Sequence, residues 1–101
     1  MKHILLTLAL SLTMGMPAMA NIELAKKNAC MGCHAIDSKV LGPAFKDVAK
    51  RYASDKEALA KVSVSIKNGG KDKWGTLAMP PSEQLSDADV RTLSAWVLGF
   101  K

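Results

Sequence analysis

Two cysteines and a histidine form the stretch with the most chemistry, Cys30-Met31-Gly32-Cys33-His34. The thiols stand three positions apart, so one helical turn presents both to the same partner. Each can add across one vinyl group of a single porphyrin, and the next residue's imidazole then lies under the iron. C-x-x-C-H is an attachment signature of c-type haem. The sequence predicts one covalent haem c on Cys30 and Cys33, with His34 as an iron ligand.

Three other interpretations of this stretch are weaker. A structural zinc site needs four ligands, whereas the chain beyond residue 20 offers two cysteines, one histidine and no second C-x-x-C pair. A thioredoxin-like redox site needs a βαβ context, and the sequence shows no such alternation. A plain disulfide would close a very small loop and would leave His34 without a role.

The first 20 residues have the pattern of a secretory signal peptide. They begin Met1-Lys2-His3, continue with an apolar run over residues 4–12 and end Ala18-Met19-Ala20. The apolar run is shorter than the roughly 20 residues that span a bilayer, which disfavours an uncleaved anchor. We expect a signal peptide at 1–20, a single domain at 21–101, a periplasmic location and no membrane insertion.

Elimination gives the second axial ligand of the iron. The only other histidine, His3, lies in the leader, as do four of the six methionines. Met31 sits between the cysteines and cannot reach the opposite face of the ring, so Met79 remains. Pro80 favours a stiff, extended backbone at that residue. The alternative is that Met79 only fills the core.

Two further residues have candidate roles around a haem. The Pro43 carbonyl could accept a hydrogen bond from the second ring nitrogen of His34 and so fix its tautomer. The Trp74 indole could donate to a propionate. Simple packing is the alternative for Trp74.

The size and the charge of the chain are both consistent with a small domain that a covalent haem stabilises. Without the 20-residue leader, 81 of the 101 residues remain, which build a modest core unless a cofactor fills it. Loss of Lys2 leaves 13 basic and 9 acidic residues, a formal charge of +4, and two propionates would bring it to about +2. The lysines are scattered with few aromatics among them, so no nucleic-acid partner is expected. A mildly basic face suits an acidic protein partner.

Periodicity and capping signals predict only helices. Asn21 can cap a helix at 22–29 that runs directly into the cysteine motif, with Leu24 as its main apolar residue. Pro43 can open a second helix with an apolar face. The Ser54-Asp55-Lys56-Glu57 capping box predicts a third, which stops at Lys67-Asn68-Gly69-Gly70.

Two segments complete the chain. Residues 62–66 alternate like a strand, but Leu59, Val62 and Ile66 also fit a helical stripe, which we prefer. After a long ordered loop at 69–84, Ser86 starts the last helix, whose apolar stripe is Leu93, Trp96, Val97 and Phe100.

The whole mature region resembles the small bacterial class I cytochromes c of the cytochrome c-551/c-552 type. The resemblance rests on Cys30 to His34, Val40 to Ala49, Ile66 to Gly69, Trp74-Gly75, Met79-Pro80-Pro81 and Ala95 to Leu98. It implies an all-α class I cytochrome c fold, about four helices around one covalently bound haem c, with the terminal helices crossing. It also implies His34 and Met79 as iron ligands, Cys30 and Cys33 as thioether anchors, the Pro43 carbonyl as the partner of His34, and Trp74 near a propionate.

The resemblance implies a soluble periplasmic electron carrier rather than an enzyme. Such a monomer passes single electrons by outer-sphere transfer between respiratory donor and acceptor proteins, periplasmic or membrane-bound, that dock transiently. Lys39, Lys71 and Lys73 are candidates for the rim of an exposed haem edge. Two other classes stay open: an enzyme or gas sensor in which Met79 leaves the iron, and a subunit of one fixed complex.

Three positions depart from the family pattern, Ser65, Ala78 and Ser82. Ser65 stands where the family often has a basic residue, so the propionate charge is expected to be compensated less. Ala78 in place of a proline is expected to loosen the ligand loop slightly. Ser82 replaces a common asparagine, which leaves hydrogen bonding near the methionine sulfur open.

Overall fold

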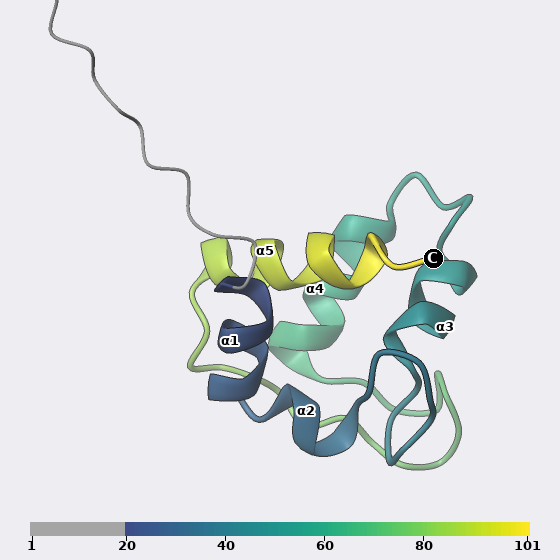
Figure 1. Ribbon diagram of the computed structural model, residues 1–101, viewed down its shortest axis with the longest axis horizontal. Helices are drawn as coiled ribbons and strands as arrows, with labels where there is room; N and C mark the ends of the chain where they lie inside the picture. The colour runs from purple at the N-terminus through teal and green to yellow at the C-terminus, as the bar shows by residue number, and fades with distance from the viewer. Residues whose placement is uncertain (1–19) are drawn as a thin grey trace, which may run out of the picture.

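The computed structural model describes residues 20–101, and its regular secondary structure over that range is helical, apart from one isolated bridge between Gly70 and Met79 (Figure 1). The helices are α1 (Ala20–Lys27), α2 (Cys30–Cys33), α3 (Phe45–Arg51), α4 (Ala58–Asn68) and α5 (Asp87–Leu98). The predicted all-α class is therefore confirmed, with α2 as a single turn added to the four expected helices. Within residues 20–101, no helix is long and apolar enough to cross a membrane. Residues 1–19, which are all but the last residue of the predicted signal peptide at 1–20, lie outside the described residues.

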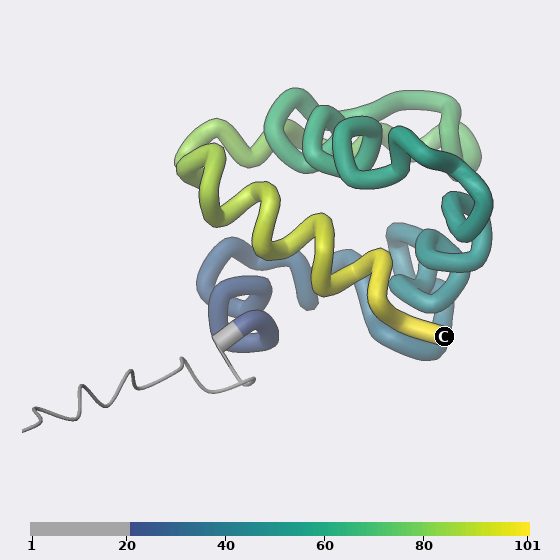
Figure 2. The backbone as a smooth tube through the Cα atoms, turned by 90° about the horizontal axis from the view of Figure 1, so that it is seen from above, coloured from purple at the N-terminus to yellow at the C-terminus, as the bar shows by residue number. Residues whose placement is uncertain are grey.

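Three of the other four helices pack against helix α5. It contacts α1, α3 and α4, and Figure 2 shows it passing between α1 and α4. Its inner face buries Val90, Leu93 and Val97. The fully buried Ser94 hydroxyl donates to the Val90 carbonyl oxygen at 2.7 Å and accepts from Ser63 of α4 at 3.0 Å. The buried Ser94 hydroxyl is thus hydrogen-bonded as donor and as acceptor, so its burial between α4 and α5 leaves no unpaired polar atom.

The N-terminal helix differs from the prediction at both ends. It begins at Ala20, so Asn21 lies inside α1 and does not cap it. It also does not run into the cysteine motif, because Ala29 adopts the left-handed conformation, with φ 61° and ψ 15°, and separates α1 from α2. The most deeply buried residue of α1 is Ala25, while Leu24 is only half-buried. The break turns α2 away from the axis of α1.

Helix α3 begins two residues later than predicted. Pro43 was expected at the first helical position, but Ala44 is still extended, with φ −58° and ψ 142°, and Phe45 is the first helical residue. The Phe45 amide donates to the Ala35 carbonyl oxygen at 2.9 Å, which ties the helix start to the preceding loop. Pro43 therefore lies outside the helix, and its carbonyl oxygen takes no part in the helical hydrogen bonds.

Helix α4 also starts late, so the predicted capping box is wrong. The helix begins at Ala58, and Asp55, not Ser54, organises the entry by accepting the Glu57 amide at 2.8 Å. The helical interpretation of 62–66 is confirmed, because that segment lies within α4.

At the other end of the molecule, Ser86 caps α5 as predicted, and its hydroxyl accepts the Asp89 amide at 3.1 Å.

Candidate functional site

A predominantly apolar cleft opens between the helices and the two long loops. Residues from all five helices line it, and the core side chains Val48, Val62, Ile66, Leu93 and Val97 form its floor. All six sequence-predicted site residues line this cleft, namely Cys30, Cys33, His34, Pro43, Trp74 and Met79. All six are brought to this one cleft, although they are spread over 50 positions of sequence.

His34 is held by its ring nitrogen. Its Nδ1 lies 2.8 Å from the Pro43 carbonyl oxygen. Because a carbonyl oxygen can only accept, Nδ1 carries the hydrogen and the Nε2 lone pair is left free. The loop is folded back for this contact by the Gly42 amide, which donates to the Cys33 carbonyl oxygen at 2.7 Å. A neutral imidazole with a fixed tautomer is the form that binds a metal ion.

Two residues that the sequence did not assign to the site, Phe45 and Gly42, shape the space around this ring. Phe45 stacks on His34, with ring centroids 5.0 Å apart and an interplanar angle of 23°. A Cβ atom at Gly42 would lie 2.5 Å from Cε1 and 2.8 Å from Nδ1 of His34. The glycine directly before Pro43 was the available signal, since glycine permits close approach of backbone to another group.

Both cysteines present free thiols, from the first and last residues of α2. Burial raises the pKa of the Cys30 thiol above its ordinary value, an effect partly opposed by a backbone hydrogen bond and reinforced by the nearby Cys33. The thiol of Cys30 is therefore protonated at neutral pH. No disulfide joins the pair, and within residues 20–101 no three His, Cys, Asp or Glu side chains group as a zinc site would require.

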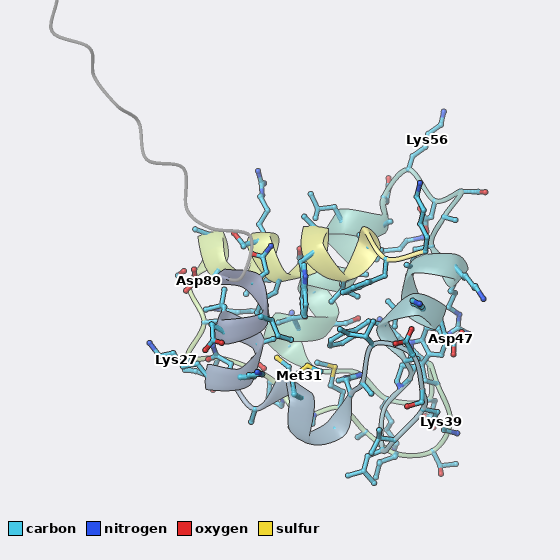
Figure 3. All side chains as sticks on the ribbon, viewed as in Figure 1. Lys27, Met31, Lys39, Asp47, Lys56 and Asp89 are labelled. Carbon is cyan, nitrogen blue, oxygen red and sulfur yellow. The ribbon has the colours of Figure 1, made fainter. Side chains whose placement is uncertain are left out.

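Met79 reaches the cleft from the loop between α4 and α5. Its backbone pairs with Gly70, with the Met79 amide donating to the Gly70 carbonyl oxygen at 2.8 Å and the reverse bond at 3.1 Å. A third bond, from the Ser82 amide to the Ile66 carbonyl oxygen at 3.0 Å, ties the end of the segment to α4. Met31 does not line the cleft; it packs against the core from α2 (Figure 3). Of the two methionines among residues 20–101, Met79 therefore lines the cleft and Met31 does not.

Trp74 lies at the mouth of the cleft and is partly exposed. The Arg51 guanidinium covers its ring, with Cζ 4.0 Å from the ring centroid. Of the three lysines expected at the rim, Lys73 lines the cleft, whereas Lys39 projects from the loop between α2 and α3 (Figure 3) and Lys71 is exposed without lining it.

The donor set fits one covalent haem. Two thiols are available for thioether bonds, an imidazole nitrogen and a thioether sulfur are available for iron, and the walls around them are apolar. Histidine and methionine side chains are among the axial donors that hold haem iron in proteins.

The chain is similar to known cytochromes c. The cytochrome c family profile matches residues 20–101. The chain is 44% identical over 84 residues to cytochrome c-552 of Nitrosomonas europaea, covering 83% of this chain and 82% of that protein. It is 46% identical over 78 residues to cytochrome c-551 of Pseudomonas aeruginosa, covering 77% of this chain and 74% of that protein.

Solved structures give the same result for the fold. The crystal structure of wild-type Nitrosomonas europaea cytochrome c552 superposes with a TM-score of 0.77 at 44% identity, covering 79% of this chain and 99% of that one. The class 1 cytochrome MtoD of Sideroxydans lithotrophicus ES-1 superposes with a TM-score of 0.67 at 26% identity, covering 78% of this chain and 90% of that one.

The fold, the donor set and these relatives lead to one identification. The chain carries one covalently attached haem c and is a monohaem electron carrier, not an enzyme. The expected class I fold is likewise confirmed. This protein belongs to the cytochrome c family, among its small class I members of the c-551/c-552 type.

Proposed function

We propose that this cytochrome carries single electrons between periplasmic respiratory proteins, with His34 and Met79 as the axial ligands of its iron. The haem, when bound, supplies one-electron redox chemistry at a six-coordinate iron. The observation that carries the proposal is that the His34 imidazole, with its Nε2 free, and the Met79 thioether line one apolar cleft.

Each ligand is held by contacts of this chain. The Pro43 carbonyl fixes the tautomer of His34, and Phe45 limits rotation of its ring. The two backbone bonds to Gly70 fix the position of Met79. Ligands that are held in place before and after electron transfer need little reorganisation, which favours outer-sphere transfer over ligand exchange. The proposal assigns thioether attachment to Cys30 and Cys33.

An exposed apolar rim supports brief docking to redox partners. Leu41 and Leu77 both line the cleft and are 58% and 63% exposed, and Val40 beside them is 53% exposed. Small redox encounters bury little surface and dissociate fast. We place the contact with donor and acceptor proteins at this rim. The cytochrome reaches these partners as a freely diffusing monomer.

The N-terminal sequence supports export to the periplasm. Cleavage after Ala20 leaves Asn21 as the first residue of the mature protein and 21–101 as its domain. Mass spectrometry of the haem protein isolated from a periplasmic fraction tests this. A mass that retains the leader would contradict the proposal of export with cleavage.

The ligation is tested by visible spectroscopy of the oxidised mature protein. The sulfur-to-iron charge-transfer band at the far-red end is expected in the wild type and in Met31→Ala, because Met31 lies outside the cleft. It is expected to vanish in Met79→Ala while haem remains attached. A wild type without the band, or a reduced wild type that binds carbon monoxide at neutral pH, would instead favour an open-site enzyme or sensor.

A further inference from the structure

Charge is unevenly placed in the cleft. Among the described residues that line it, Lys73 is the only lysine or arginine and Asp72 is the only carboxylate. A haem brings two propionate carboxylates into this predominantly apolar space. An ionised carboxylate in such surroundings is costly unless a cation or hydrogen-bond donor pairs with it. The position of the Lys73 ammonium therefore indicates where in the cleft a propionate can be paired with a cation.

The Lys73 ammonium is directed at α4. Its Nζ donates to the Ser65 hydroxyl oxygen at 3.0 Å, and Ser65 lies on the wall of the cleft. A serine hydroxyl that accepts one bond still has its own hydrogen to donate. An ammonium has three hydrogens, so two remain after the bond to Ser65. The pair thus presents several donors and one positive charge at the same edge of the cleft.

The segment that carries Lys73 is fixed from α3. The Arg51 guanidinium donates to the Lys73 carbonyl oxygen and also covers the Trp74 ring. Asp72 and Gly75 have positive φ values of 62° and 116°, which makes a tight turn on either side of the lysine and the tryptophan. This turn brings Lys73 and Trp74 to the mouth of the cleft together.

We propose that Lys73 and Ser65 form the binding site for a haem propionate, with Arg51 positioning Lys73 through its backbone. The proposal rests on a haem seated in this cleft, as in the proposed function. The positive charge of Lys73 favours the ionised propionate and so lowers its pKa. The same charge disfavours the additional positive charge of ferric iron, so it raises the reduction potential.

Other charged groups surround the lysine. The adjoining surface that Lys73 shares with α3 and α4 carries Arg51, Tyr52, Glu57, Lys61 and Asp72. The Lys61 ammonium is already paired with Asp55 at 2.7 Å. Glu57 and Asp72 are therefore the anionic groups whose titration is to be separated from that of a propionate.

The experiment is a redox titration of the haem-loaded mature protein across pH, for wild type and Lys73→Gln. Lys73→Gln is expected to have a lower potential at neutral pH, with the propionate-linked step moved upward by about 1 pH unit or more. Lys73→Arg is expected to restore both, and Ser65→Ala to produce a smaller shift in the same direction. Lys71→Gln is the matched control, because Lys71 is exposed and does not line the cleft.

Equal potentials and equal pH profiles for Lys73→Gln and Lys71→Gln would overturn the proposal, because a general loss of charge would then explain both. Loss of the far-red band in Lys73→Gln alone would also overturn it, since Lys73 would then support the Met79 loop. A wild type that lacks that band contradicts the His34 and Met79 assignment only. The titration would still decide the role of Lys73, because the haem is covalently attached.

Discussion

A Cβ atom at Gly42 would lie 2.5 Å from Cε1 of His34, so the backbone of one loop and the imidazole of another segment occupy adjoining space with no room between them. We expect Gly42→Ala to push the imidazole away from its hydrogen bond to Pro43. Overpacking at such a site costs about 1–3 kcal/mol. Denaturant unfolding of the oxidised haem protein measures this change in the free energy of unfolding.

Gly32→Ala is the matched control for that substitution. Gly32 lies in α2 between Cys30 and Cys33, and a Cβ atom there has no neighbour within 4 Å. It should leave the stability and the spectrum close to those of the wild type. If both variants lose the same stability, the close approach of Gly42 to His34 is not the cause.

The second prediction concerns Gly69, where α4 ends. Its φ of 78° and ψ of −177° lie in a region that essentially only glycine occupies, at a cost of about 1–3 kcal/mol for other residues. A Cβ atom would also lie 2.5 Å from the Met79 carbonyl oxygen and 3.0 Å from the Pro81 nitrogen. Gly69→Ala is therefore expected to displace the segment that carries Met79.

The far-red charge-transfer band of the oxidised protein and its denaturant midpoint measure that displacement, and both are expected to fall. Gly70→Ala is the control, because a Cβ atom there meets only Cδ of Lys73, at 3.9 Å. A Gly69→Ala protein with the wild-type band and midpoint would mean that this backbone contact does not hold Met79.

The glycines show why the site was only partly predictable from sequence. The residues with reactive atoms, such as Cys30, His34 and Met79, follow from chemistry and elimination, because few others can do their work. Gly42 and Gly69 matter through space that only the folded chain defines. From the sequence, Gly69 was predicted to stop a helix and Gly42 was part of a motif. Neither prediction includes the close approach of Gly42 to His34 or of Gly69 to Met79.

Charge placement was missed for a similar reason. Ser65 was considered by itself and suggested weaker compensation of the propionates. The hydrogen bond between Lys73 and Ser65 spans a helix and a loop, so spacing along the chain does not predict it. Helix starts were misplaced by up to three residues, because a turn built on Asp55 moves the N-cap of α4 from Ser54 to Glu57.

The third prediction is that Ala29→Gly stabilises the protein. Ala29 has φ 61° and ψ 15°, and the left-handed region costs a residue with a Cβ about 1–2 kcal/mol. Glycine removes that cost but loses more conformational entropy on folding. We expect a net gain of about 0.5–1 kcal/mol in the free energy of unfolding. Thermal unfolding of the oxidised protein measures it.

The control for Ala29→Gly is Ala95→Gly, at an exposed position inside α5. There the same replacement has no strain to relieve and is expected to cost about 1 kcal/mol. Opposite signs at the two positions are the expected result. A loss of stability at both would mean that the left-handed break between α1 and α2 carries no strain.

The fourth prediction concerns stability in acid. The hydrogen bond from Lys61, assisted by the Glu57 amide, lowers the pKa of the Asp55 carboxyl below its ordinary value. A lowered pKa in the folded state means that the unfolded state binds the proton more readily. Asp55 therefore contributes stability at pH values above its ordinary pKa, and that contribution is lost as the pH falls through the folded pKa.

Asp55→Asn keeps an oxygen that can accept the Glu57 amide but removes the charge. We expect this variant to have lower stability than the wild type at neutral pH and a shallower loss below pH values typical of carboxyl titration. Urea unfolding of the oxidised protein over a pH series measures both slopes. Ser54→Ala, at an exposed residue outside α4, should follow the wild-type curve. Parallel acid curves for wild type and Asp55→Asn would show that the pairing of Asp55 with Lys61 adds nothing to stability.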